Sequence, residues 1–79
     1  MMKPAGIPTK KLQKIILEID ELEALRLCDG EGLSQVAAGE LMGISRGTVQ
    51  RLVTSGRRKM VEAIIECRAL VIKTEDDQV

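Results

Sequence analysis

The side chains best suited to chemistry in this sequence are hydrogen-bond donors that lie in one acid-free stretch. Between Leu41 and Val61 there are five basic residues and no acidic one. A guanidinium group can donate to two acceptors at once, which suits phosphates and the edge of guanine, and a glutamine amide matches adenine in the same way. The five bases are Arg46, Arg51, Arg57, Arg58 and Lys59.

The charges around this stretch are segregated, although the formal net charge of the chain is zero. Four lysines and no acid precede Glu18, and seven acids accompany the single base Arg26 between Glu18 and Glu40. Segregation of this kind gives a face that attracts anions, whereas interspersed charges would describe an ordinary solvated helix surface. The distribution therefore favours a nucleic-acid partner.

Two helices joined by a tight turn are needed to present these donors, and the segment 35–53, QVAAGELMGISRGTVQRLV, predicts them. Gly39 supplies the small residue where two helices cross, and Gly43 can adopt the positive φ of the turn. Ser34 and Ser45 are the expected N-caps. This spacing predicts a helix-turn-helix whose recognition helix begins at Ser45 and enters the major groove of DNA. A plain helical hairpin would explain the glycines but not a second helix rich in arginine.

The donors on these helices are assigned to three roles. The candidates for contacts with base edges are Arg46, Gln50 and Arg51. The candidates for phosphate contacts near the helix N-termini are Ser34, Gln35, Ser45 and Thr48. The candidates for contacts with the DNA backbone beyond the groove, with a solvated helix surface as the alternative, are Arg57, Arg58 and Lys59.

Two further helix boundaries follow from capping residues and glycines. A helix is expected to start at Asp20, which has capping-box spacing to Glu23, and to end at Gly30 and Gly32. The last helix is expected from Arg46 to about Glu66, and a kink or break at Gly56 is open because glycine weakens a helix interior.

Two aliphatic runs, 15–19 and 69–73, have the character of short strands. They could pair within one chain or across a dimer. Residues 1–13 are expected to form an irregular lead-in, and residues 74–79 a frayed acidic tail. The predicted fold is a single, mainly α domain over residues 1–79, with a long C-terminal helix and two short flanking strands.

The amino-acid composition limits which classes of protein this chain can belong to. A chain of 79 residues without Phe, Tyr or Trp has little material for a core, which keeps a homodimer open. No apolar run approaches the length of a membrane span, so a cytoplasmic location and no membrane contact are expected. Cys28 and Cys67 fit no metal-ligand spacing, and they are expected to be small buried apolar residues. We expect no cofactor, no metal and no enzymatic activity, because histidine and tyrosine are absent and no nucleophile motif is present.

The chain also resembles known families. The segment from LEIDELEALRL to MGISRGTVQRL is similar to region four of bacterial sigma factors, which binds the promoter's minus-thirty-five element. KPAGIP, DELEALRL, EGLSQ and MGISR together resemble a small family of bacterial and archaeal proteins described as predicted DNA-binding proteins. The resemblance spans residues 3–72 and implies a sigma region-four-like fold and transcription regulation through double-stranded DNA.

A protein-interaction module is the alternative function. Sigma-like folds also bind polymerase subunits and regulators, and the apolar cluster near the end of the last helix could serve such a partner or a second copy of the chain. The cluster consists of Met60, Val61, Ile64 and Ile65.

Overall fold

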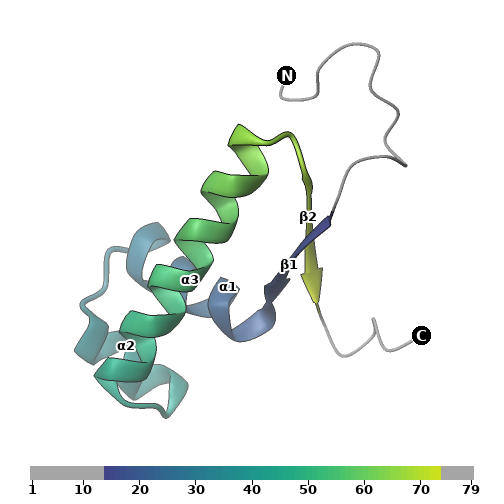
Figure 1. Ribbon diagram of the computed structural model, residues 1–79. Coiled ribbons are helices and arrows are strands. Elements are labelled where there is room, and N and C mark those ends of the chain that lie inside the picture. The colour runs from purple at the N-terminus through teal and green to yellow at the C-terminus, as the bar shows by residue number, and fades with distance from the viewer. Residues whose placement is uncertain (1–13, 74–79) are drawn as a thin grey trace.

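The computed structural model of the chain describes residues 14–73, which form a mainly helical fold with two short strands (Figure 1). This confirms the predicted fold class at that level. The expected lead-in at 1–13 and tail at 74–79 lie outside the described residues. In chain order, the elements are β1 (Lys14–Glu18), α1 (Ile19–Leu25), the π-helical turn η2 (Arg26–Gly30), α2 (Gln35–Met42), α3 (Arg46–Ile65) and β2 (Ala69–Lys73).

The two strands pair in parallel within one chain, in register from Lys14 opposite Ala69 to Glu18 opposite Lys73. Of the two pairings left open by the sequence, the structure has the intrachain one. β2 folds back from the C-terminal end of α3 and lies beside β1 (Figure 1). Alternate residues of β1, Ile15 and Leu17, are buried against the helices, which fixes the face that the sheet turns inward.

The start of α1 differs from the sequence prediction. The helix begins at Ile19 rather than Asp20, and its N-cap is Glu18, which has extended backbone angles. The Glu18 N–H donates to the Glu21 carboxylate at 2.8 Å. The predicted capping box between Asp20 and Glu23 is therefore wrong, because Glu21 is the acid that satisfies the backbone at the strand-to-helix junction.

The end of the first helix agrees with the prediction, with one addition. The last turn, η2, widens to a π-helix, in which the Glu31 N–H donates to the Arg26 carbonyl at 2.9 Å. Gly30 is its last residue, and Gly32 takes a φ of +75° in the connection that follows. The wide turn buries Leu27 in the core, which an apolar pattern alone does not reveal.

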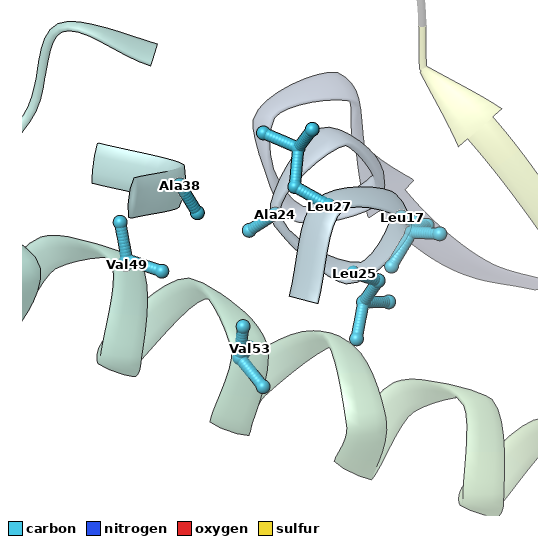
Figure 2. Packing of buried hydrophobic residues seen from close by; sticks show 7 residues of the cluster. All are labelled: Leu17, Ala24, Leu25, Leu27, Ala38, Val49 and Val53. Carbon is cyan, nitrogen blue, oxygen red and sulfur yellow. The ribbon is translucent and has the colours of Figure 1, made fainter. Parts of the chain in front are cut away.

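The core lies where β1, α1, η2, α2 and α3 meet, and it is built from aliphatic side chains (Figure 2). The largest fully buried side chains are Leu17, Val49 and Val53. Ala24 and Ala38 complete the cluster, and both are fully buried. The core is thus filled by leucine, valine and alanine side chains, without the bulk that aromatic residues would add.

Gly56 has a packing role that the sequence analysis did not assign. A Cβ built at this position would lie 2.8 Å from Leu25 Cδ1 and 3.2 Å from Leu25 Cγ. α3 runs through Gly56 as one helix, so the break that the sequence left open does not occur. The missing side chain lets α1 cross α3 at short range, which offsets the weaker helix propensity.

The cysteines were expected to be buried, and no membrane span was expected. Cys28 and Cys67 are both half-buried rather than buried. Within residues 14–73, no helix is both long and apolar enough to span a bilayer.

Candidate nucleic-acid interface

Two serines begin the helices α2 and α3, as the sequence predicts. The Ser34 hydroxyl accepts a hydrogen bond from the Ala37 N–H at 3.1 Å, and the Ser45 hydroxyl accepts one from the Thr48 N–H at 3.2 Å. Each cap satisfies one of the four N–H groups that a helix start leaves without an intrahelical acceptor. The remaining N–H groups at both helix starts can still donate to an anion.

The turn between α2 and α3 depends on two glycines. Gly43 ends α2 with a φ of +73°, a conformation that is strained for residues with a side chain. A Cβ on Gly39 would lie 2.7 Å from the Ile44 carbonyl oxygen and 3.5 Å from Val49 Cγ2. The predicted roles of both glycines, at the turn and at the helix crossing, are confirmed by this geometry.

The start of α3 lies close to the start of α2, so residues distant in sequence share one surface. The Arg46 guanidinium donates to the Gln35 side-chain oxygen at 3.3 Å. The hydroxyls of Ser45 and Thr48 lie 2.9 Å apart, and Arg51 donates to the Thr48 hydroxyl at 3.4 Å. Thr48 and Gln35, both expected to contact phosphates, therefore orient two of the arginines.

A strip of polar side chains continues along the exposed face of α3. Gln50, Arg51, Thr54 and Arg58 are exposed, and together with Ser55 they border a shallow hollow of about 280 Å³. Arg51 and Arg58 are two helical turns apart, so they lie on the same face. Thr54 was not singled out from the sequence, although its position between Gln50 and Arg58 at helical spacing would have found it.

The five bases of the acid-free stretch divide into two groups. Arg57 donates twice to Asp29, at 2.6 and 3.0 Å, and Lys59 donates to Glu21 at 2.7 Å. Both bases thus face α1 and η2. Within residues 14–73, Arg46, Arg51 and Arg58 make no ion pair. The bases without an acidic partner are the ones on the exposed strip or at its start.

The ion pairs of the other two bases shift the ionisation of their partners. The hydrogen bond from Arg57 is the main cause that lowers the pKa of Asp29, and the same pair raises the pKa of Arg57. Asp29 and Arg57 are therefore both charged across the ordinary pH range, and their charges largely cancel.

Glu21 is a buried acidic residue that the sequence did not predict. The residue is 4% exposed, and it accepts hydrogen bonds from Lys59, Ser55 and the Glu18 N–H. Burial alone would raise its pKa, but these hydrogen bonds and the Lys59 charge outweigh burial and lower the pKa. Its helical spacing to buried Ala24 and Leu25 is the sequence signal that could have placed it inside.

The arrangement as a whole gathers hydrogen-bond donors on one surface. Two helix starts, two neutral polar side chains and three arginines that have no acidic partner among residues 14–73 face outward together. Among residues 14–73, no group of three or more His, Cys, Asp or Glu side chains could hold a metal ion. Such a surface can bind an extended anion and can donate to acceptors between its charges.

Comparison with known proteins gives a family but not a function. The profile of the family described as Protein of unknown function DUF134 matches residues 1–79. A UPF0251 protein of Shewanella sediminis is 51% identical over 75 residues, covering 95% of this chain and 78% of the relative. A UPF0251 protein of Desulforudis audaxviator is 48% identical over 71 residues, covering 90% of this chain and 46% of the relative.

Many of the relatives are longer than this chain. The chain spans about half the length of several curated relatives that it matches, 46% and 47% for those of Prosthecochloris aestuarii and Chloroherpeton thalassium. No solved structure matches the chain.

Proposed function

The chain belongs to the DUF134 family of proteins of unknown function, and we propose that it binds duplex DNA through a helix-turn-helix formed by α2 and α3. The observation that carries the proposal is the division of the bases on α3. The three without acidic partners among residues 14–73 lie on or at the start of one exposed strip, and the two that are paired face the rest of the fold. A merely solvated helix surface gives no reason for that division.

We propose that the first turns of α3 enter the major groove. Arg46, Gln50 and Arg51 then face base edges, where arginine matches guanine and glutamine matches adenine. The hydrogen bonds that Gln35 and Thr48 make to Arg46 and Arg51 hold both guanidinium groups in place before DNA arrives. Such preorganisation lowers the entropic cost of binding.

Phosphate contacts are proposed around this centre. The N-termini of α2 and α3, at Ser34 and Ser45, direct backbone N–H groups outward and favour anions through the helix dipole. Arg58 extends the strip towards the DNA backbone. Arg57 and Lys59, which the sequence suggested for contacts with the DNA backbone, lie outside the proposed interface because each of them already neutralises an acid of this chain.

Selection of bound sequences from a random duplex pool, followed by salt titration on the selected site, tests the proposal. With three to five neutralised phosphates, the slope of log K against log salt is expected to be roughly −3 to −4.5. Arg51→Ala is expected to lower affinity for the selected site more than for scrambled duplex. A flat salt titration, or a pool without enrichment, would contradict sequence-specific DNA binding.

The regulatory role extends this proposal. A sequence-specific DNA-binding domain of this size, similar to region four of sigma factors, fits a transcription regulator. The family name carries no function, so the regulator assignment depends on the DNA-binding experiment.

A further inference from the structure

An apolar groove lies on a different side of α3 from the exposed strip, between α1, η2 and the C-terminal half of α3. It has a volume of about 610 Å³, and its apolar lining includes Leu22, Met60, Val61 and Ile64. The three side chains from α3 are 39%, 51% and 52% exposed. They continue the apolar stripe to which Val49 and Val53, buried in the first half of α3, belong. Ala63 is buried in the second half of the helix, but residues 14–73 leave Met60, Val61 and Ile64 partly uncovered.

We propose that a second copy of this chain covers the groove, so that two copies form a symmetric dimer through the C-terminal halves of α3. In a two-fold interface both copies contribute the same surface patch, so this patch must be complementary to itself. It therefore needs a hollow and a protrusion close together. Ile65 follows groove-lining Ile64 and is 73% exposed, which supplies the protrusion. Antiparallel α3 helices bring the hollow of each copy to the protrusion of the other.

The charges at the rim of the groove favour a neutral apolar occupant. Arg57 is paired with Asp29, and Arg26 is paired with both Glu23 and Glu31. An acidic or basic peptide would find its counter-charges at this rim already neutralised. A second copy presents the same balanced rim, and the net charge of zero gives no overall repulsion between two copies.

The exposed apolar surface is large enough for a small dimer. The exposed parts of Met60, Val61, Ile64 and Ile65 together amount to on the order of 400 Å² per copy, which matches the apolar share of an interface with ~600 Å² per partner. A chain of 79 residues with a core of small aliphatic side chains has a thin margin of stability, which association would increase.

The proposed dimer also deepens the proposed function, and this step rests on DNA binding. At 1.5 Å per residue, Arg51 lies about 15 Å from Val61 and about 20 Å from Ile64 along α3. Antiparallel helices that meet there would hold their arginines on the order of 30–40 Å apart, which includes the 34–36 Å between half-sites one DNA turn apart. The selected DNA site is therefore expected to be an inverted repeat.

Sedimentation of the full chain, without DNA, tests the dimer directly. We expect a species of twice the 8.7 kDa chain mass, which dissociates on dilution. Val61→Glu places a charge in the groove and is expected to weaken the dimer at least tenfold. Val36→Glu is the matched control, since Val36 is also a helical valine and is 54% exposed, against 51% for Val61. It should leave the dimer intact.

Each outcome decides the proposal. A parent chain that stays monomeric over the concentration series overturns it, as does equal weakening by both valine variants. Ile64→Ser, with helical content followed by circular dichroism, separates dissociation from unfolding: a folded variant that remains dimeric also overturns the proposal. A dimer that binds no DNA would contradict the proposed function alone, and a monomer that binds DNA would contradict the dimer alone.

Discussion

Lys59 Nζ lies 2.7 Å from Glu21 Oε1, and this ion pair joins α3 to α1 at an acidic residue that is only 4% exposed. The Ser55 hydroxyl and the Glu18 N–H donate to the same carboxylate. Glu21 thereby connects the strand-to-helix junction of β1 and α1 with the middle of α3. A base in the acid-free stretch is consequently part of the fold's internal structure.

Lys59→Met should destabilise the fold by about 1–3 kcal/mol, because it leaves a buried carboxylate with one partner fewer. The melting temperature measured by circular dichroism checks this. Lys73→Met is the matched control, since Lys73 is exposed and forms no ion pair within residues 14–73. Equal melting temperatures for the two variants would mean that the pair does not stabilise the fold.

The stability of the parent should depend on pH through Glu21. Its pKa in the folded chain lies below the ordinary value of 4.5, so its contribution to stability is complete above that pH and is lost as the pH falls further. Glu21→Gln removes this contribution. We expect the gap in melting temperature between parent and variant to be widest at neutral pH and to narrow below about pH 4.5.

The matched variant for this titration is Glu40→Gln, at an exposed acid of α2 that makes no ion pair within residues 14–73. Its melting temperature should run parallel to that of the parent over the same range. A gap for Glu21→Gln that stays constant down to acid pH would show that the carboxylate does not stabilise the fold through its charge.

A comparison of Gly43 with Gly47 distinguishes the effect of backbone conformation from the effect of the space available for a side chain. A Cβ would meet nothing within 4 Å at either position, but only Gly43 has a positive φ, of +73°. Gly43→Ala should therefore destabilise by about 1–2 kcal/mol, and Gly47→Ala should stabilise α3 by about 0.5–1 kcal/mol. Chemical denaturation measures both changes, and shifts of the same sign would show that the turn does not depend on the left-handed conformation.

Arg57 and Arg58 are neighbours with opposite expected effects on DNA. Arg58→Ala should weaken binding to selected and scrambled duplex alike, and make the salt slope shallower by about one unit. Arg57→Ala removes the ion pair with Asp29, so it should lower the melting temperature slightly and leave the salt slope unchanged. Fluorescence anisotropy over a salt series distinguishes the two, and a changed slope for Arg57→Ala would contradict its assignment to the fold.

The starts of α2 and α3 could be predicted because they depend on local chemistry. Ser34, Ser45 and Gly43 act on the backbone within a few residues, and the amino-acid types therefore determine the geometry there. The start of α1 could not be placed in the same way. Several acids near it could serve as the cap, and the choice depends on Lys59 and Ser55 holding Glu21 in the core.

The polar strip was only partly predictable for a similar reason. Helical spacing identifies Arg46, Gln50 and Arg51 as neighbours on α3, but it does not show which bases have acidic partners. Arg57 and Lys59 do not belong to the strip, because they form ion pairs with Asp29 and Glu21, which lie many residues away in the sequence. Pairing across the fold, rather than charge along the chain, separates the two groups.

The parallel pairing of β1 with β2 has a consequence for the order in which the chain folds. Lys14 and Ala69 lie near opposite ends of the described residues, so their pairing closes almost all of residues 14–73 into one loop. Loop closure costs entropy that local helix contacts do not, and contacts between distant residues form slowly. Strand pairing should thus follow helix docking, and the amide hydrogens of the two strands should exchange with solvent before those of α3.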